Sequence, residues 1–190
     1  MQAQSKGNDD PGCTELEKRK YEEMWAVDIY SKTSPAYHRF FDQVTGIVEP
    51  GDKVIEFGCG TGIGLNEIAK TNDVLGIDIA HNCLKYDLPF KQACLWEPMD
   101  VAGDVGFCVD VMEHIPPQKI DDTFSEIMAC VPKCLFIACL LDDHLGMKHI
   151  NQPLHLTLRS PDWWLDAAKK YGKVTHLFTD VRAVHFVIES

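Results

Sequence analysis

From residue 52 onward, short apolar runs alternate with segments of helical periodicity, and glycine-containing turns separate many of them. The apolar runs are rich in β-branched residues, which is typical of buried parallel strands. Strands are predicted at 53–57, 74–77, 90–95, 105–109 and 134–141. Because helical segments lie between most of these runs, we expect an α/β fold with a parallel sheet and helices on both of its faces.

The last third of the chain changes this alternation. Residues 162–171 follow Pro161 and have a helical pattern that Gly172 ends. The apolar runs at 174–179 and 183–188 come next, close enough in sequence to form an antiparallel hairpin.

The N-terminal part has a different character. Residues 1–13 are mostly polar and are expected to form a disordered tail, because they offer little apolar surface to bury. Thr14, with Glu17 three residues later, predicts a capped helix. Ser34 and Pro35 predict the start of a second helix. Aromatic residues in these helices leave open whether the segment 14–50 forms a lid.

The length of 190 residues suits one domain, and we found no repeat or linker, so residues 14–190 are predicted to be a single domain. No apolar run approaches the roughly 20 residues that a membrane helix needs. The N-terminus lacks the pattern of a signal peptide, and a cytoplasmic protein is expected. The oligomeric state is not predicted.

The formal net charge is −11, from 18 Lys and Arg against 29 Asp and Glu, which disfavours non-specific nucleic-acid binding. The eight cysteines form no C-x-x-C pair, and several lie in apolar runs. They are interpreted as reduced packing residues, and no metal is expected.

The segment after the first predicted strand carries the clearest chemical signal. Gly58, Gly60 and Gly62 stand at alternate positions, where the backbone can turn sharply and approach a ligand closely. The dinucleotide fingerprint would need a glycine where Ile63 or Leu65 stands, and the Lys-Ser/Thr ending of a P-loop is absent. The loop therefore predicts a nucleotide-type ligand that need not carry phosphate, and it disfavours a nicotinamide-dependent oxidoreductase.

Asp78 ends the next strand, 20 residues after Gly58. A carboxylate there can accept hydrogen bonds from both ribose hydroxyls. Capping of the following turn is the alternative role for this side chain.

With these residues in place, the sequence resembles class I S-adenosylmethionine-dependent methyltransferases. Residues 56–62, Glu-Phe-Gly-Cys-Gly-Thr-Gly, match the family's first motif of an acidic residue, an apolar residue and Gly-x-Gly-x-Gly. Residues 110–115, Asp-Val-Met-Glu-His-Ile, are similar to the Glu-Val-Leu-Glu-His-Val stretch of the ubiquinone-biosynthesis-type members. Residues 155–164 are similar to the family's His before a Ser/Thr-Pro helix start.

The resemblance covers roughly 52–190 and implies a Rossmann-like, seven-stranded, mostly parallel sheet with an antiparallel last strand. It implies S-adenosylmethionine as cofactor and S-adenosylhomocysteine as product. Glu56 and the glycine loop would face the methionine part, Asp78 the ribose, and Asp110 with its neighbours the sulfonium. Leu95 and Trp96 would face the adenine, although the third strand lacks the Asp that many members carry. The candidate cofactor-binding residues are Glu56, Phe57, Gly58, Cys59, Gly60, Gly62, Asp78, Ile79, Leu95, Trp96, Asp110 and Val111.

A methyl acceptor that carries a proton needs a base, and histidine titrates near neutral pH. The candidates are His114 and His155, for each of which a structural role is the alternative. The region 141–160 is expected to form the substrate wall.

The stretch after the fourth strand lacks the Asp/Asn-Pro-Pro-aromatic and Pro-Cys motifs of nucleic-acid base methyltransferases. Together with the acidic charge, this favours methylation of a small molecule at oxygen or nitrogen. Two alternatives stay open. One is a protein or RNA acceptor, and the other is a catalytically silent domain that binds the cofactor as a sensor or partner subunit.

Overall fold

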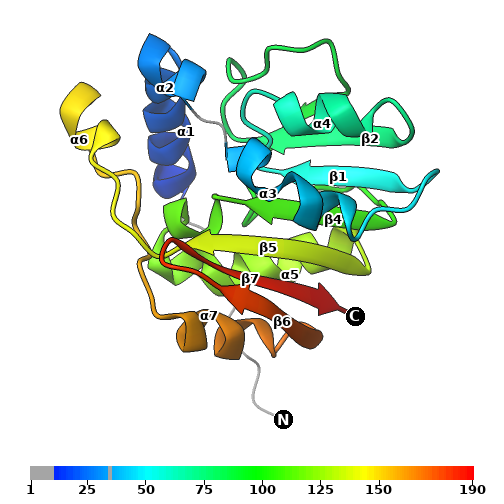
Figure 1. The fold of residues 1–190 in the computed structure, drawn as a ribbon. Coiled ribbons are helices and arrows are strands. Elements are labelled where there is room, and N and C mark those ends of the chain that lie inside the picture. Colours follow the sequence, from blue (N-terminus) through cyan, green and yellow to red (C-terminus); the bar gives the residue numbers. More distant parts are fainter. Residues whose placement is uncertain (1–10, 34–35) are drawn as a thin grey trace.

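The computed structural model describes residues 11–33 and 36–190 (Figure 1). The expectation of disorder at residues 1–10 and the predicted helix start at Ser34 and Pro35 lie outside the described residues.

A seven-stranded sheet forms the centre of the molecule, in the order β3-β2-β1-β4-β5-β7-β6. Neighbouring strands are parallel except at β7, which runs antiparallel to both β5 and β6. The strands are β1 (Lys53–Phe57), β2 (Asp73–Asp78), β3 (Phe90–Gln92), β4 (Val105–Val109), β5 (Lys133–Cys139), β6 (Lys173–Thr179) and β7 (Ala183–Glu189). This topology confirms the predicted fold class, including the antiparallel last strand and the C-terminal hairpin.

Two strand ends differ from the prediction. The third strand was expected to reach residue 95 but ends at Gln92, because the chain turns where the Glu97 N–H donates to the Cys94 carbonyl at 3.2 Å. The fifth was expected to reach residue 141 but ends at Cys139, after which the Leu140 N–H donates to the Arg182 carbonyl.

Helices cover both faces of the sheet (Figure 1). The covering helices include α4 (Ile63–Ile68), α5 (Ile120–Cys130) and α7 (Pro161–Ala168). The short helix α6 (Leu145–His149) lies to one side of the sheet (Figure 1), and the 3-10 turns η1 (Met112–His114) and η2 (Pro117–Lys119) follow β4. The Oγ of Ser160 accepts a hydrogen bond from the Trp163 N–H at 3.3 Å and so caps α7. This helix ends at Ala168, three residues before the predicted end.

The side chains of each central strand alternate between two cores, as the two-residue period of a strand requires. On one face, Phe136 and Phe186 belong to the apolar cluster that contains the buried residues of α5 and α7. On the other face, Leu135 and Val187 belong to the cluster that contains those of α3 (Ala36–Thr45) and α4. The sheet is therefore sealed from water on both sides near β5, which fixes the register of these strands.

The N-terminal helices depart most from the sequence prediction. The helix α1 (Pro11–Trp25) begins at Pro11, so the predicted start at Thr14 and a disordered tail through residue 13 are wrong for residues 11–13. Proline has the backbone φ of a first helical residue and no N–H to leave unpaired there. Thr14 is not a cap, because its hydroxyl donates to Glu97 Oε1 at 2.7 Å and accepts from Trp96 Nε1 at 3.1 Å. The short α2 (Asp28–Thr33) was not predicted.

No helix within the described residues is both long enough and apolar enough to cross a membrane.

Substitution of Phe136 by alanine tests the larger core. Its ring is fully buried and stacks on Phe186 with ring centroids 5.4 Å apart. We expect Phe136→Ala to lower the free energy of unfolding by about 3–5 kcal/mol, because the neighbouring rings cannot close the cavity. Urea unfolding followed by circular dichroism measures this loss. Val181→Ala, at a position that is 84% exposed, should change it by less than about 0.5 kcal/mol. Equal losses in the two variants would contradict the assigned core.

Candidate functional site

The glycine loop leaves β1 and enters α4 through a series of left-handed backbone conformations. Gly58 has a φ of 76° and Gly62 a φ of 73°. A Cβ added to Gly58 would lie 2.4 Å from Cγ2 of Val111, so this position needs glycine both for its conformation and for the close approach of the chain after β4. The N–H groups of Gly58 and Cys59 donate to the Ile77 carbonyl at 2.8 and 3.0 Å, which holds the loop against β2.

Asp78 joins the loop to the end of β2 through its side chain. One carboxylate oxygen accepts the Gly60 N–H at 3.0 Å, and the other accepts the Ala80 N–H at 2.9 Å. The bond to Ala80 is the turn-capping role considered as an alternative. Each oxygen keeps a further lone pair for a ligand hydroxyl. Burial raises the pKa of Asp78 to about 6, although the backbone hydrogen bonds oppose this shift.

Glu56 supplies a second buried carboxylate beside the loop. Its Oε2 atom has no hydrogen-bond partner, and the side chain is 8% exposed. Burial, with the nearby charge of Asp78, raises the pKa of Glu56 well above its usual value. A buried oxygen without a partner is costly, so a ligand that donates to it would be stabilised.

One cavity connects these residues with the segment after β4. It is lined by all of the predicted cofactor-binding residues except Phe57 and Gly62, and by His114. Phe57 is fully buried in the core, and Gly62 is the residue that precedes α4 and packs near Leu84. His155 does not line this cavity, but its ring contacts that of His114.

The first two helices form a wall of the cavity. Glu17, Tyr21 and Trp25 of α1 line it, as does Tyr30 of α2. The sequence analysis singled out the aromatic residues, but it assigned Glu17 to a capping box. That assignment is wrong, since Glu17 lies inside α1, is buried and forms an ion pair with Lys20. Because most residues of α1 are polar, the sequence does not indicate that the charged side chains of Glu17 and Lys20 are buried.

Two long-range hydrogen bonds attach α1 to the loop before α7. Lys20 Nζ donates to the Pro153 carbonyl, and the Tyr21 hydroxyl donates to the Leu154 carbonyl, each at 3.4 Å. The region between β5 and α7 therefore meets α1 beside the cavity, in agreement with Figure 1, where α6 lies next to α1 and α2.

The two candidate histidines form a pair. Their ring centroids are 4.7 Å apart in an edge-to-face arrangement. The Nδ1 atom of His114 lies 3.1 Å from the Leu154 carbonyl oxygen, and that of His155 lies 2.6 Å from the Leu141 carbonyl oxygen. Burial, followed by the neighbouring His155, lowers the pKa of His114 to about 3, so this ring is neutral at physiological pH.

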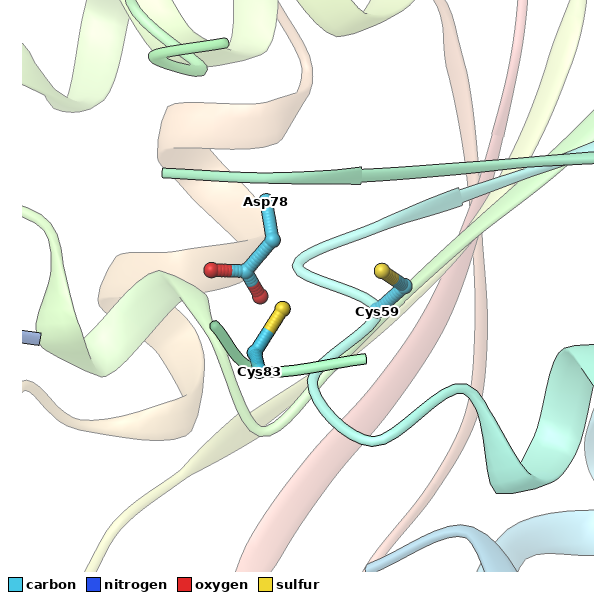
Figure 2. A group of neighbouring side chains, drawn as sticks. All are labelled: Cys59, Asp78 and Cys83. Atoms are coloured by element: carbon cyan, nitrogen blue, oxygen red, sulfur yellow. The ribbon is translucent and has the colours of Figure 1, made fainter. Parts of the chain in front are cut away.

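Two thiols, of Cys59 and Cys83, lie next to the carboxylate of Asp78. Figure 2 shows the carboxylate of Asp78 and the thiol of Cys83 pointing toward each other, with Cys59 of the glycine loop beside them. One ligand atom from each of the three lies within 4.8 Å of the others. Contact with Cys83 and burial both raise the pKa of Cys59. No disulfide joins any of the eight cysteines, all of which lie in the described part of the chain.

No protein-family model and no curated protein sequence matches the chain. Several solved structures are similar to it. A 1,6-didemethyltoxoflavin-N1-methyltransferase from Burkholderia thailandensis, bound to S-adenosylhomocysteine, has a TM-score of 0.64 at 11% identity, over 100% of this chain and 92% of that one. A TehB-like S-adenosylmethionine-dependent methyltransferase from Corynebacterium glutamicum has a TM-score of 0.60 at 15% identity, over 95% and 99%.

A third similar structure is the magnesium protoporphyrin IX methyltransferase from Synechocystis, also with S-adenosylhomocysteine, at a TM-score of 0.58 and 16% identity over 95% of each chain. The chain has the class I methyltransferase fold. At these identities the likeness concerns the fold. The narrower resemblance to the ubiquinone-biosynthesis type stays a prediction.

The glycine loop of this methyltransferase fold can be tested by its stability. Gly58→Ala places a methyl group against Val111, whereas a Cβ at Gly51, where φ is 93°, would meet nothing within 4 Å. Both variants carry the cost of a left-handed alanine, about 1–2 kcal/mol. We expect Gly58→Ala to lose about 1–3 kcal/mol more than Gly51→Ala in urea unfolding, because of overpacking. The double variant Gly58→Ala/Val111→Ala should recover part of this difference. No recovery would contradict the assigned contact.

The raised pKa of Asp78 predicts a pH dependence of stability. Between about pH 4 and 6 the folded state keeps the Asp78 proton that the unfolded chain has lost, so stability falls as the pH rises through this window. Asp78→Asn removes this titration. Relative to that variant, the free energy of unfolding of the parent chain should decrease by on the order of 3 kcal/mol from pH 4 to 7. A difference that stays constant across the window in denaturant titrations would overturn the assignment.

Proposed function

We propose that the chain transfers a methyl group from S-adenosylmethionine to an oxygen or nitrogen of a small-molecule acceptor. The observation that carries the proposal is the single cavity that joins the glycine loop and Asp78 to the segment after β4. In this fold, two of the similar structures named above hold S-adenosylhomocysteine.

The cavity residues suit the parts of that cofactor. Asp78 has free lone pairs for ribose hydroxyls on a carboxylate that the loop already orients. The unpartnered Glu56 oxygen would accept a hydrogen bond from the ammonium group of the methionine part, which would relieve its burial. Leu95 and Trp96 supply an apolar surface for the adenine, with the Trp96 indole held by Thr14.

The opposite end of the cavity suits methyl transfer. In this reaction the acceptor atom attacks the methyl carbon in line with the sulfur, the carbon–sulfur bond breaks, and its electron pair stays on sulfur. The cofactor supplies the electrophile, so the protein mainly aligns the acceptor and excludes water. Asp110 lies here with a φ of 53°, a strained conformation that the Asp110 N–H bond to the Ile137 carbonyl helps to hold.

The two histidines are not equivalent as bases. With its pKa lowered to about 3, His114 binds a proton weakly and is a poor proton acceptor at neutral pH. We therefore propose that His114, which lines the cavity, positions the acceptor and that His155, whose ring contacts that of His114, receives any proton.

A small acceptor is supported by the wall that α1 and α2 form and by the acidic charge of the chain. We infer that α1 acts as a lid over a single domain. Small molecules appear in the names of two similar enzymes, as didemethyltoxoflavin and magnesium protoporphyrin IX. Another similar chain, a putative methyltransferase from Haloferax volcanii, forms a complex with the activator Trm112, so a macromolecular acceptor or partner is the second candidate.

Calorimetric titration with S-adenosylmethionine and S-adenosylhomocysteine tests the proposal. We expect micromolar binding that weakens at least about tenfold in Asp78→Ala, a loss of about 1.4 kcal/mol or more. Asp87→Ala is a matched control, because Asp87 is exposed and does not line the cavity. NAD should not bind. The absence of binding by either sulfur ligand would sink the methyltransferase proposal.

Turnover then separates an enzyme from a silent binding domain. An active enzyme should convert S-adenosylmethionine to S-adenosylhomocysteine in the presence of some member of a panel of phenols, enols and amines. Tight cofactor binding with no product from small molecules, proteins or RNA would favour the sensor or partner subunit.

A further inference from the structure

Three potential metal ligands converge beside the acceptor end of the cavity, which His114 lines and Glu113 and His155 do not. Glu113 and His114 belong to η1, and His155 belongs to the loop before α7. One ligand atom from each of the three lies within 4.8 Å of the others. The residues are about 40 positions apart in the chain and are brought together by the Leu156 and Thr157 N–H groups, which donate to the Glu113 carbonyl at 2.8 and 2.9 Å.

The Glu113 carboxylate is buried, and within the described residues no positively charged group pairs with it. Its side chain is 0% exposed, and neither oxygen has a hydrogen-bond partner of normal geometry. Asp110 and Cys139 also lie close enough to form a ligand group with it, and the Asp110 carboxylate adds negative charge to its surroundings. A buried carboxylate in such a place requires either a proton or a cation.

The imidazoles are oriented as metal ligands usually are. The Nδ1 atom of each ring faces a backbone carbonyl, of Leu154 for His114 and of Leu141 for His155. A carbonyl accepts but cannot donate, so Nδ1 carries the proton in a neutral ring. This second contact, which fixes the tautomer and the ring plane, is typical of histidines that bind metal through the other nitrogen. His114 has a further backbone hydrogen bond with Asp110, which an ion bound to this ring would have to replace.

We propose that Glu113, His114 and His155 bind one divalent transition-metal ion, of which Zn²⁺ is the representative, beside the acceptor end of the cavity. Two imidazoles and one carboxylate form a common donor set for such ions. With bonds of about 2.0–2.1 Å, tetrahedral ligand atoms are about 3.3 Å apart, so the group has to close by about 1.5 Å at most. The cation supplies the positive charge that Glu113 lacks. No metal was expected from the sequence, because the spacing of the cysteines matches no metal-binding motif.

The role of the ion, although not its binding, rests on the proposed function. With the ion bound, the lone pair of His155 is used for ligation, so the ion replaces His155 in activating the acceptor. It lowers the pKa of an oxygen bound to it, with the proton released to solvent. His114 lines the cavity, so an acceptor hydroxyl that reaches the ion would also lie near Asp110 and Val111. The proposal therefore narrows the acceptor to an oxygen nucleophile that can coordinate a metal, such as a phenol or an enol.

The group of Cys59, Asp78 and Cys83 is a rival site for the same ion (Figure 2). Both oxygens of Asp78 already accept backbone hydrogen bonds, and burial keeps Cys59 in its protonated form. Binding there would require the thiols to release their protons and would use the lone pairs of Asp78 that the proposed ribose contact needs. The group of Asp110, Glu113 and Cys139 also includes a thiol, so the proposed site is the one of the three groups found among the described residues that offers no sulfur. A spectroscopic probe of thiolate ligation can therefore distinguish it from the other two.

The test uses the full chain after treatment with a chelator. Zn²⁺ is titrated against a competing chromogenic chelator, and Co²⁺ is followed by its absorption. We expect one ion per chain, a Co²⁺ spectrum without thiolate charge transfer, and a higher melting temperature in Zn²⁺. Glu113→Gln and His155→Ala should each weaken binding by more than about tenfold, since even loss of a ligand's hydrogen-bond partner costs 10- to 100-fold.

Matched control variants distinguish loss of the proposed metal site from binding at the rival site and from unfolding. Cys83→Ser and His149→Ala, the latter at an exposed position beyond the three ligands, should leave the affinity unchanged. S-adenosylhomocysteine binding is measured on every variant, and it reports both folding and the proposed function independently of the metal. Cofactor binding without metal binding would overturn the metal site alone. Zn²⁺ binding that is lost in Cys83→Ser, or kept in Glu113→Gln, would also overturn it.

Discussion

The bond from the Gly60 N–H to the Asp78 carboxylate is the interaction on which the candidate site depends most. It joins the loop after β1 to the end of β2, beside the backbone bonds of Gly58 and Cys59 to Ile77. Because adjacent parallel strands end at the same edge of the sheet, this short link places a glycine backbone and a carboxylate on one cavity wall. The raised pKa of Asp78 is the cost of holding that carboxylate in a buried position.

The sheet and the core of the candidate site were predictable because their signals are local. A strand buried on both faces is an apolar run, so β1 and β4 have the predicted bounds. The glycine spacing and the strand-end Asp78 are likewise set within one β–loop–α–β unit. The end of β3 was not predictable in this way, since a turn at Cys94 redirects residues whose composition still favours a strand.

The parts that the sequence did not disclose depend on distant partners. Thr14 looks like a helix cap, but its hydroxyl binds Glu97 and Trp96, more than 80 positions away. Glu17 and Lys20 look like surface charges and are buried against the loop before α7. The convergence of Glu113 with His155 requires η1 and that loop to meet, which neither periodicity nor spacing can express.

Different segments of the chain form the two ends of the cavity, and this bears on how the substrate specificity of such a protein can change. The residues proposed to hold the cofactor come mainly from the loops that follow β1, β2 and β4, whereas the acceptor end also draws on α1 and on the connection between β5 and α7. Insertions or exchanges in that connection leave the register of β1, β2 and β4 intact. Changes in that connection can therefore alter which compound is recognised while the cofactor-binding half keeps its structure.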